Sequence, residues 1–315
     1  MDVISIGEAM VLFTPERKGP MRYAREFTSR IAGAEANTMI GLAKLGHKTG
    51  WISRLGADEF GSMIRSVIRG EGVDVSGTSE DKEHQTGIFF RENVYADHVR
   101  VMYYRKNSAA SKLHPGLIDE AYLSKAKYLY ITGITPALSN TCYETIFHAM
   151  KLAKKHKMQI IFDPNIRYKL WSEEKARETI LKMAADSDVV MPGISEGQFL
   201  FGTDDCEEIA DRLHKFGAGT VVVKKGKEGA YYSSGLEKGH AAGYPVEIVA
   251  DPVGAGDGFA AGVLSGLLDG FSLKEAVSRG CAIGAMVTTV NGDIEGLPDR
   301  KTLEQFLSGQ DDVSR

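Results

Sequence analysis

The feature that most restricts the fold of this chain is a regular alternation of short apolar runs and helix-length segments between residues 127 and 223. Apolar runs at 128–131, 159–162, 188–191 and 220–223 have the length of buried strands, and the segments between them, such as 140–155, have the length of helices. Strands that are separated by helices pair in parallel, and a parallel sheet needs helices on both faces. The sequence therefore predicts an α/β protein with three layers, α/β/α, and a mainly parallel central sheet.

A glycine-rich segment at residues 251–258 leads directly into the apolar run 259–264. Its sequence is Asp-Pro-Val-Gly-Ala-Gly-Asp-Gly. The glycines leave the backbone N–H groups open to an anion, and the start of the following helix adds partial positive charge. Asp257 would repel that anion unless it accepts a proton from a nucleophile that attacks it. The segment therefore predicts phosphoryl transfer, with Asp257 as the base and Gly254, Ala255 and Gly256 forming an anion hole; a plain glycine-rich turn is the alternative.

Other phosphate-binding motifs do not fit this segment. Its spacing matches neither the dinucleotide fingerprint nor the Walker loop, which argues against a nicotinamide-dependent oxidoreductase. The net charge of -4 gives no basic footprint for nucleic acid or an anionic membrane. Three widely spaced cysteines indicate free thiols, and the sequence shows neither a membrane span nor a signal peptide. The sequence thus predicts a cytoplasmic enzyme without nucleic-acid or membrane partners.

The pattern changes between residues 86 and 105, where β-prone runs at 87–90 and 99–104 flank a polar turn. This indicates a β insertion into the α/β body. We interpret it as a lid over the site, and an ordinary hairpin packed on the core is the alternative.

The segment 251–258, together with Ala261-Gly262-Val263, resembles the second signature of the ribokinase-like (PfkB) carbohydrate kinases. Residues 33–37, Gly-Ala-Glu-Ala-Asn, resemble the first signature of this family. The resemblance covers the chain from Asp2 to about Leu307. It implies a single kinase domain over 1–315, with the lid formed mainly by 86–105 and part of 8–30, and a homo-oligomer, a dimer or larger, through this lid.

The family resemblance also implies nucleotide and metal sites. Lys225, Gly226 and Gly229 resemble the family's nucleotide loop. Gly254, Ala255 and Gly256 are also implied to contact ATP, and Asn291 resembles a residue that lies beside adenine. Solvated lysines in a hairpin turn are the alternative for the first loop. Glu196 corresponds to a residue that organises Mg²⁺, although Gly193 stands where the family has Asn. A monovalent cation near Asp251 is left open.

The strings around Tyr103-Tyr104-Arg105-Lys106, residues 132–139 and Arg167 resemble the 2-keto-3-deoxygluconate kinases within this family. The arginine fork matches a carboxylate, as a sugar acid requires. The resemblance implies that the following residues contact the sugar acid: Gly33, Asn37, Tyr103, Arg105, Ile134, Arg167 and Asp257. Phe89 departs from members that have Tyr.

The predicted reaction is ATP-dependent phosphorylation of the primary hydroxyl of 2-keto-3-deoxygluconate. A fructokinase or ribokinase of the same fold is the nearest alternative. A non-catalytic sugar-acid sensor is the alternative from another class, and the Asp at position 257 argues against it.

Overall fold

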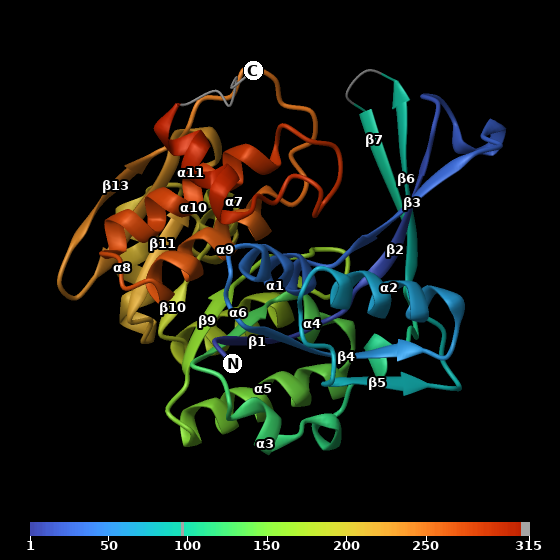
Figure 1. The fold of residues 1–315 in the computed structure, drawn as a ribbon. Helices are drawn as coiled ribbons and strands as arrows, with labels where there is room; N and C mark the ends of the chain where they lie inside the picture. Colours follow the sequence, from blue (N-terminus) through green and yellow to red (C-terminus); the bar gives the residue numbers. More distant parts are fainter. Residues whose placement is uncertain (96–97, 310–315) are drawn as a thin grey trace.

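Nine strands form the central sheet of the body within residues 1–95 and 98–309, which this computed structural model describes (Figure 1). Their spatial order is β13-β12-β11-β10-β9-β8-β1-β4-β5. The pairings from β11 to β5 are parallel, whereas β12 and β13 pair antiparallel at one edge. The strands are β1 (Val3–Ile6), β4 (Thr49–Gly56), β5 (Thr78–Asp81), β8 (Tyr128–Thr132), β9 (Gln159–Asp163), β10 (Val189–Val190), β11 (Thr220–Lys224), β12 (Gly229–Ser234) and β13 (Lys238–Ala242). The predicted mainly parallel sheet is confirmed, although β10 is shorter than the apolar run 188–191.

Helices cover both faces of this sheet because its strands are apolar on both sides. In β11, Val222 joins one hydrophobic core while Val221 and Val223 join the other, as the alternation of side chains along a strand requires. The first core packs against α1, α9 and α10, and the second packs against α5, α6 and α8. The helices are α1 (Ala34–Lys44), α2 (Glu59–Gly70), α3 (Glu120–Leu123), α4 (Ile134–Leu138), α5 (Asn140–Lys155), α6 (Glu173–Ala185), α7 (Ile194–Phe201), α8 (Cys206–Phe216), α9 (Ala255–Leu268), α10 (Leu273–Val287) and α11 (Arg300–Ser308). No helix in the described part of the chain has the length and apolar character to span a membrane.

A second, smaller sheet projects from the body (Figure 1). Its order is β3-β2-β6-β7, with β2 (Met10–Pro15), β3 (Phe27–Ala32), β6 (Ile88–Tyr95) and β7 (His98–Tyr104). We call it the lid sheet. Both predicted segments, 86–105 and part of 8–30, contribute strands to it; residues 96–97 of the predicted lid and 310–315 of the predicted domain lie outside the described residues.

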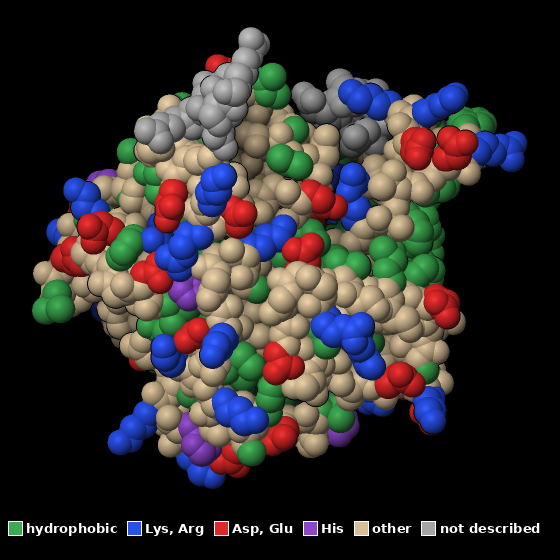
Figure 2. Space-filling view, in the orientation of Figure 1, with side chains coloured by type: hydrophobic (Ala, Val, Ile, Leu, Met, Phe, Trp, Pro, Cys, Tyr) green, Lys and Arg blue, Asp and Glu red, His purple; other side chains and the backbone are tan. Residues whose placement is uncertain are grey.

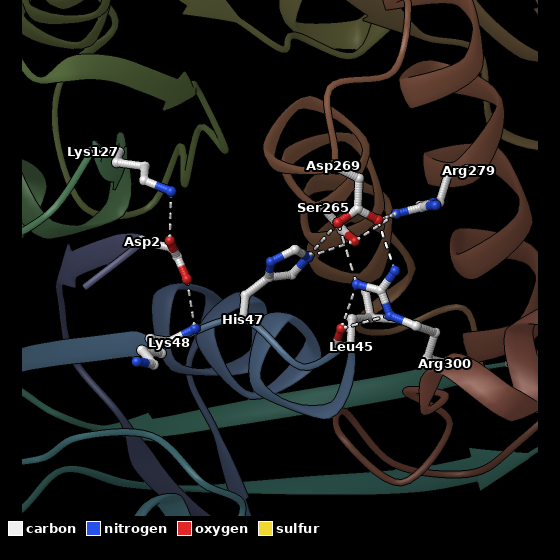
Figure 3. A network of polar contacts seen from close by, with 9 residues as sticks. All are labelled: Asp2, Leu45, His47, Lys48, Lys127, Ser265, Asp269, Arg279 and Arg300. Carbon is white, nitrogen blue, oxygen red and sulfur yellow. Dashed lines mark hydrogen bonds and ion pairs between the residues drawn. The ribbon is translucent and has the colours of Figure 1, made fainter.

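Helix α9 carries the glycine-rich segment at its start, and a polar network holds its other end (Figure 3). Asp269, the C-cap of α9, accepts hydrogen bonds from Arg279 at 2.5 Å and from Arg300 at 2.8 Å. The Arg300 guanidinium also donates to the carbonyl oxygen of Leu45 at the end of α1, and His47 contacts Ser265 within α9 at 2.9 Å. The network therefore fixes α9 to α1, α10 and α11.

Asp269→Asn is expected to lower the free energy of unfolding by about 1–2 kcal/mol near neutral pH, because two guanidinium groups lose their carboxylate while solvent screens part of the interaction. Burial acts to raise the pKa of Asp269, but hydrogen bonds from Arg300 and Arg279 outweigh it and lower the pKa from 3.8 to about 2. This contribution to stability is therefore present above pH 3.8 and is lost as the pH falls toward 2. Denaturant unfolding of both proteins as a function of pH would check this.

The matched control is Asp186→Asn, which removes the carboxylate of an exposed ion pair with Lys154. Such pairs contribute about 0–1 kcal/mol. Equal losses in the two variants would contradict the structural role of the Asp269 network.

Candidate active site

The carboxyl ends of the parallel strands meet the start of α9, and polar side chains gather there. Asp163 ends β9, Lys224 ends β11, and Glu8 lies two residues beyond β1. Open α/β sheets bind their ligands at this edge. These positions therefore define the candidate active site.

The glycine-rich segment forms a tight turn before α9. Gly254 is the N-cap with φ of 80°, and a Cβ there would lie 2.7 Å from the carbonyl oxygen of Asp293. Only glycine fits this conformation in this space without strain. Because α9 begins at Ala255, the N–H groups of Ala255, Gly256 and Asp257 have no partner within the helix. The Ala255 N–H donates to the carbonyl oxygen of Pro252 at 3.4 Å, so the turn offers an anion chiefly the N–H groups of Gly256 and Asp257 together with the positive end of the helix.

Asp257 lies in the first turn of α9 and is 9% exposed. Its Oδ2 accepts a hydrogen bond of 2.8 Å from Asn37 Nδ2, which also lies 3.5 Å from Asp293 Oδ2. The pKa of Asp257 is raised to about 8, chiefly by burial; the hydrogen bond from Asn37 and the charge of Arg167 oppose this rise, while the charges of Asp293 and Asp163 add to it. A carboxylate with such a pKa is a stronger base than an exposed one.

Asp293 is a residue of this site that the sequence reasoning missed. Burial and the charge of Asp251 raise the pKa of Asp293 to about 6. Its Oδ1 is buried and has no hydrogen-bond partner among the described residues. Asp293 follows Asn291, the predicted neighbour of adenine, by two residues, and Asn291 is exposed whereas Asp293 is buried.

A buried group of charges lies beside Asp257 and was also missed. Lys224 Nζ donates to Asp163 Oδ2 at 2.7 Å. Burial acts to lower the pKa of Lys224, but the charges of Asp163 and Glu196 outweigh it and leave the pKa raised. The site therefore contains a fixed positive charge in addition to the helix dipole. The position of Lys224 at the end of a predicted strand was the available signal.

Glu196, the candidate metal residue, caps helix α7. Its Oε2 accepts from the N–H of Gly193 at 2.7 Å and its Oε1 accepts from the N–H of Ile166 at 2.9 Å. Burial raises its pKa, and the charge of Lys224 opposes this. Among the described residues, no three His, Cys, Asp or Glu side chains are grouped so that they could hold a metal ion. Each Glu196 oxygen accepts one backbone hydrogen bond, and a carboxylate oxygen has a second lone pair that a Mg²⁺-bound water could use.

The residues predicted to contact a sugar acid lie on both the body and the lid sheet. Gly33 is the N-cap of α1, and a Cβ there would lie 2.5 Å from the carbonyl oxygen of Glu8. The Arg105 guanidinium forms an ion pair with Glu8, and its carbon lies 5.6 Å from the ring centroid of Tyr103. Tyr103 in turn stacks on Phe89 at 5.3 Å. The structure therefore brings the lid residues Tyr103 and Arg105 to the body near Gly33.

Ile134 and Arg167 follow the ends of β8 and β9. The Ile134 N–H donates to Thr132 Oγ1 at 3.1 Å, and that hydroxyl donates to buried Glu35 at 2.7 Å. Glu35, whose pKa burial raises, thus ties this segment to the start of α1. Arg167 is exposed, yet its charge acts to lower the pKa of Asp257. Arg167 therefore lies close enough to Asp257 for its positive charge to act on that carboxyl group.

The predicted nucleotide loop joins β11 to β12 as an antiparallel hairpin. Gly226 and Gly229 have φ of 58° and 96°, in the left-handed region that favours glycine. A Cβ on Gly229 would lie 2.1 Å from the carbonyl oxygen of Ala241. Lys225 pairs with Glu228 at 3.1 Å. The turn conformation itself thus explains both glycines, in agreement with the alternative of a plain hairpin turn. Their contact with a nucleotide stays a prediction.

A doubly covered sheet whose strand ends face a glycine-rich helix start, with a buried Asp beside it, defines a kinase that acts on a small molecule. The chain matches the pfkB family carbohydrate kinase over residues 1–300 and belongs to this family.

This chain is similar in sequence to named proteins and similar in fold to proteins of known structure. It is 43% identical over 313 residues to the 2-dehydro-3-deoxygluconokinase of Bacillus subtilis (strain 168), covering 98% of this chain and 96% of that protein. The crystal structure of a PfkB protein from Polaromonas sp. JS666 is 43% identical, with a TM-score of 0.89 over 96% of this chain and 99% of that one. A protein from E. coli solved in complex with ATP and Mg²⁺ is 28% identical, with a TM-score of 0.91 over 98% and 99% of the two chains.

Proposed function

We propose that this carbohydrate kinase transfers the γ-phosphoryl group of ATP to the primary hydroxyl of 2-dehydro-3-deoxygluconate, the compound also called 2-keto-3-deoxygluconate. The observation that carries the proposal is the buried Asp257 carboxylate within an open helix N-terminus. The 2-dehydro-3-deoxygluconokinase name of the relative at 43% identity supports the choice of substrate.

Each group has a role in this proposal. Asp257 orients the attacking hydroxyl and accepts its proton as the bond to phosphorus forms. The N–H groups of Ala255, Gly256 and Asp257 stabilise the charge on the phosphoryl oxygens, and Lys224 adds a positive charge. The carboxylate of the sugar acid pairs with Arg167 and Arg105, beside Gly33, Asn37, Tyr103 and Ile134. Lys225, Gly226, Gly229 and Asn291 line the nucleotide site.

The proposed cofactors are ATP and Mg²⁺, which the structure of the E. coli protein with both ligands supports. Mg²⁺ would bind between the ATP phosphates and the region of Glu196, and it would offset the charge of the phosphates. A monovalent cation near Asp251 also stays a prediction. Both oxygens of the Asp251 carboxylate accept hydrogen bonds from Arg91, so such a cation would bind nearby carbonyl groups. Activity in K⁺, Na⁺ and tetramethylammonium salts would test it.

The experiment that tests the substrate is a coupled assay of ADP release across a panel of sugars and sugar acids. We expect a high kcat/KM with 2-dehydro-3-deoxygluconate and much lower values with D-fructose and D-ribose, and the galactonate-derived epimer in the same panel would measure the selectivity between the two sugar acids. A preference for fructose or ribose would support the alternative kinases. Binding of the sugar acid without ADP release would support a sensor. We further propose that the enzyme acts in the cytoplasm on small molecules, as one kinase domain whose lid sheet covers the sugar.

The pH dependence follows from the raised pKa of Asp257. The base must be ionised to accept a proton, so kcat/KM is expected to rise with pH and to level off above about pH 8. Asp293→Asn removes a negative charge that helps to raise this pKa, and the rising limb should then move to lower pH. Initial rates of both proteins between about pH 6 and pH 10 would show this. A rate that does not change with pH over this range would contradict Asp257 as the base.

We also propose a homo-oligomer through the lid sheet. The face of the lid sheet that bears Phe13 and Phe90 carries an aromatic cluster with Phe27 and Tyr104, with ring centroids 5.3–5.9 Å apart. Tyr104 is 62% exposed. Figure 2 shows hydrophobic side chains gathered where the lid sheet meets the body near α2. Large exposed apolar patches mark interaction sites.

Tyr104→Glu is expected to shift the protein toward monomer, because it places a charge within the proposed apolar contact. Light scattering coupled to gel filtration would measure the mass. Leu236→Glu, at a residue that is 99% exposed on the β12–β13 turn, is the control. A monomeric wild-type protein would contradict the proposal.

A further inference from the structure

Three arginines of the lid segments each contact a carboxylate of the body. Arg30 pairs with Glu295 at 2.9 Å, Arg105 pairs with Glu8, and Arg91 pairs with Asp251. The strand register explains why all three arginines lie on the same face of the lid sheet. Leu12 lies opposite both Arg30 and Phe89, and Phe89 lies opposite Tyr103. Because side chains two residues apart share a face, Arg91 lies with Phe89 and Arg105 with Tyr103, on the face opposite the aromatic cluster.

The Arg91 contact reaches the segment that leads into the anion hole. Its two terminal nitrogens donate to the two carboxylate oxygens of Asp251 at 2.5 and 2.9 Å. Asp251 is 3% exposed, and the side chain of Arg91 is 17% exposed. A paired fork of this kind fixes the orientation of both groups, and removing one partner leaves a buried charge without compensation.

Asp251 in turn holds the backbone of the glycine-rich turn. Its Oδ1 accepts a hydrogen bond of 3.1 Å from the N–H of Val253, the residue before the N-cap Gly254. Its own N–H donates to the carbonyl oxygen of Thr288 at 3.1 Å. A continuous set of contacts therefore runs from the lid sheet through Asp251 to the start of α9.

From these contacts we infer that Arg91 is a positioning residue for phosphoryl transfer: its pairing with Asp251 sets the conformation of the anion hole when the lid sheet is docked on the body. The inference rests on the proposed role of residues 254–257 as the anion hole. It predicts that the lid contributes to the transfer step itself, and not only to sugar binding.

The test is the kinetics of Arg91→Ala and Arg91→Lys with 2-dehydro-3-deoxygluconate and Mg·ATP. We expect Arg91→Ala to lower kcat at least about tenfold while both KM values stay within about threefold, because the loss falls on the transition state. Arg91→Lys should keep an intermediate kcat, since one charge-assisted hydrogen bond can remain. Millimolar guanidinium should restore part of the kcat of Arg91→Ala with saturation.

The matched control is Arg100→Ala, which removes an arginine from the same hairpin. The Nη1 atom of Arg100 donates to Glu92 at 3.0 Å, within the lid sheet. This variant should keep kcat within about twofold. Asp251→Asn should resemble Arg91→Ala, and the double variant should be no slower than either single one, because both act through one contact. Thermal unfolding of each variant verifies that it is folded.

Three results would overturn the inference: an unchanged kcat in Arg91→Ala, a raised KM for the sugar with kcat kept, or losses of Arg91→Ala and Asp251→Asn that multiply. Failure of the underlying assignment would look different. If the anion hole lay elsewhere, Gly256→Ala, which places a methyl group in open space at the turn, would keep the wild-type turnover, whatever the Arg91 variants did.

Discussion

Asp257→Asn is expected to lower kcat by about 10³- to 10⁴-fold, within the range that a positioned proton acceptor contributes. The amide has the shape of the carboxylate and can still accept the hydrogen bond from Asn37, but it cannot take a proton from the sugar hydroxyl. ATP affinity should be nearly unchanged because the backbone N–H groups of the turn remain. Steady-state kinetics together with calorimetric titration of ATP would separate the two effects.

Asp293→Asn is the matched control, because Asp293 approaches the same Asn37 amide at 3.5 Å and is also buried. It should lose less kcat than Asp257→Asn. Comparable turnover in Asp257→Asn and the wild-type enzyme would exclude Asp257 as the base, and a joint loss of turnover and ATP affinity would indicate damage to the turn instead.

Arg167→Ala is expected to lower kcat/KM for 2-dehydro-3-deoxygluconate by about a hundredfold to ten-thousandfold. The estimate assumes two charge-assisted hydrogen bonds to the sugar-acid carboxylate, each contributing about 1.5–3 kcal/mol, with about 1.4 kcal/mol per factor of ten. The slow reaction with a neutral sugar such as D-fructose should hardly change, because that substrate has no carboxylate. Comparing the two substrates in the same ADP-release assay measures the change in selectivity.

Lys169→Ala provides the control for charge, since Lys169 is exposed two residues away. Its selectivity should match the wild type. If Arg167→Ala lost activity on both substrates equally, Arg167 would act on the transfer step and not on the carboxylate. If it lost none, the sugar acid would bind elsewhere.

Local patterns predicted the layers of the fold and the glycine-rich turn because these depend on residues close in the sequence. The apolar runs became β8, β9 and β11 within one or two residues of the expected ends, and α9 begins within the segment that was singled out. The family resemblance added residues such as Arg105 and Asn37. Their partners were not predicted.

Those partners are distant in the chain, which is why sequence patterns did not reveal them. Asn37 contacts Asp257 across 220 positions, and Arg91 contacts Asp251 across 160. Lys224 and Asp163 lie 61 positions apart and meet because β9 and β11 flank β10 in the sheet. From the sequence alone, a lysine at the end of an apolar strand is expected to be exposed to solvent. The order of the strands in the sheet is what places Lys224 next to Asp163.

The two ends of α9 have a consequence for how enzymes with this architecture diversify. The network around Asp269 anchors the helix to three other helices, and its opposite end presents the glycine-rich turn. In the proposed mechanism, the groups that act on the phosphoryl group therefore lie on the anchored body, while the lid sheet shares in recognition of the sugar. Substitutions on that sheet can exchange one acceptor for another without rebuilding the donor side, provided that its arginine contact with the turn is kept.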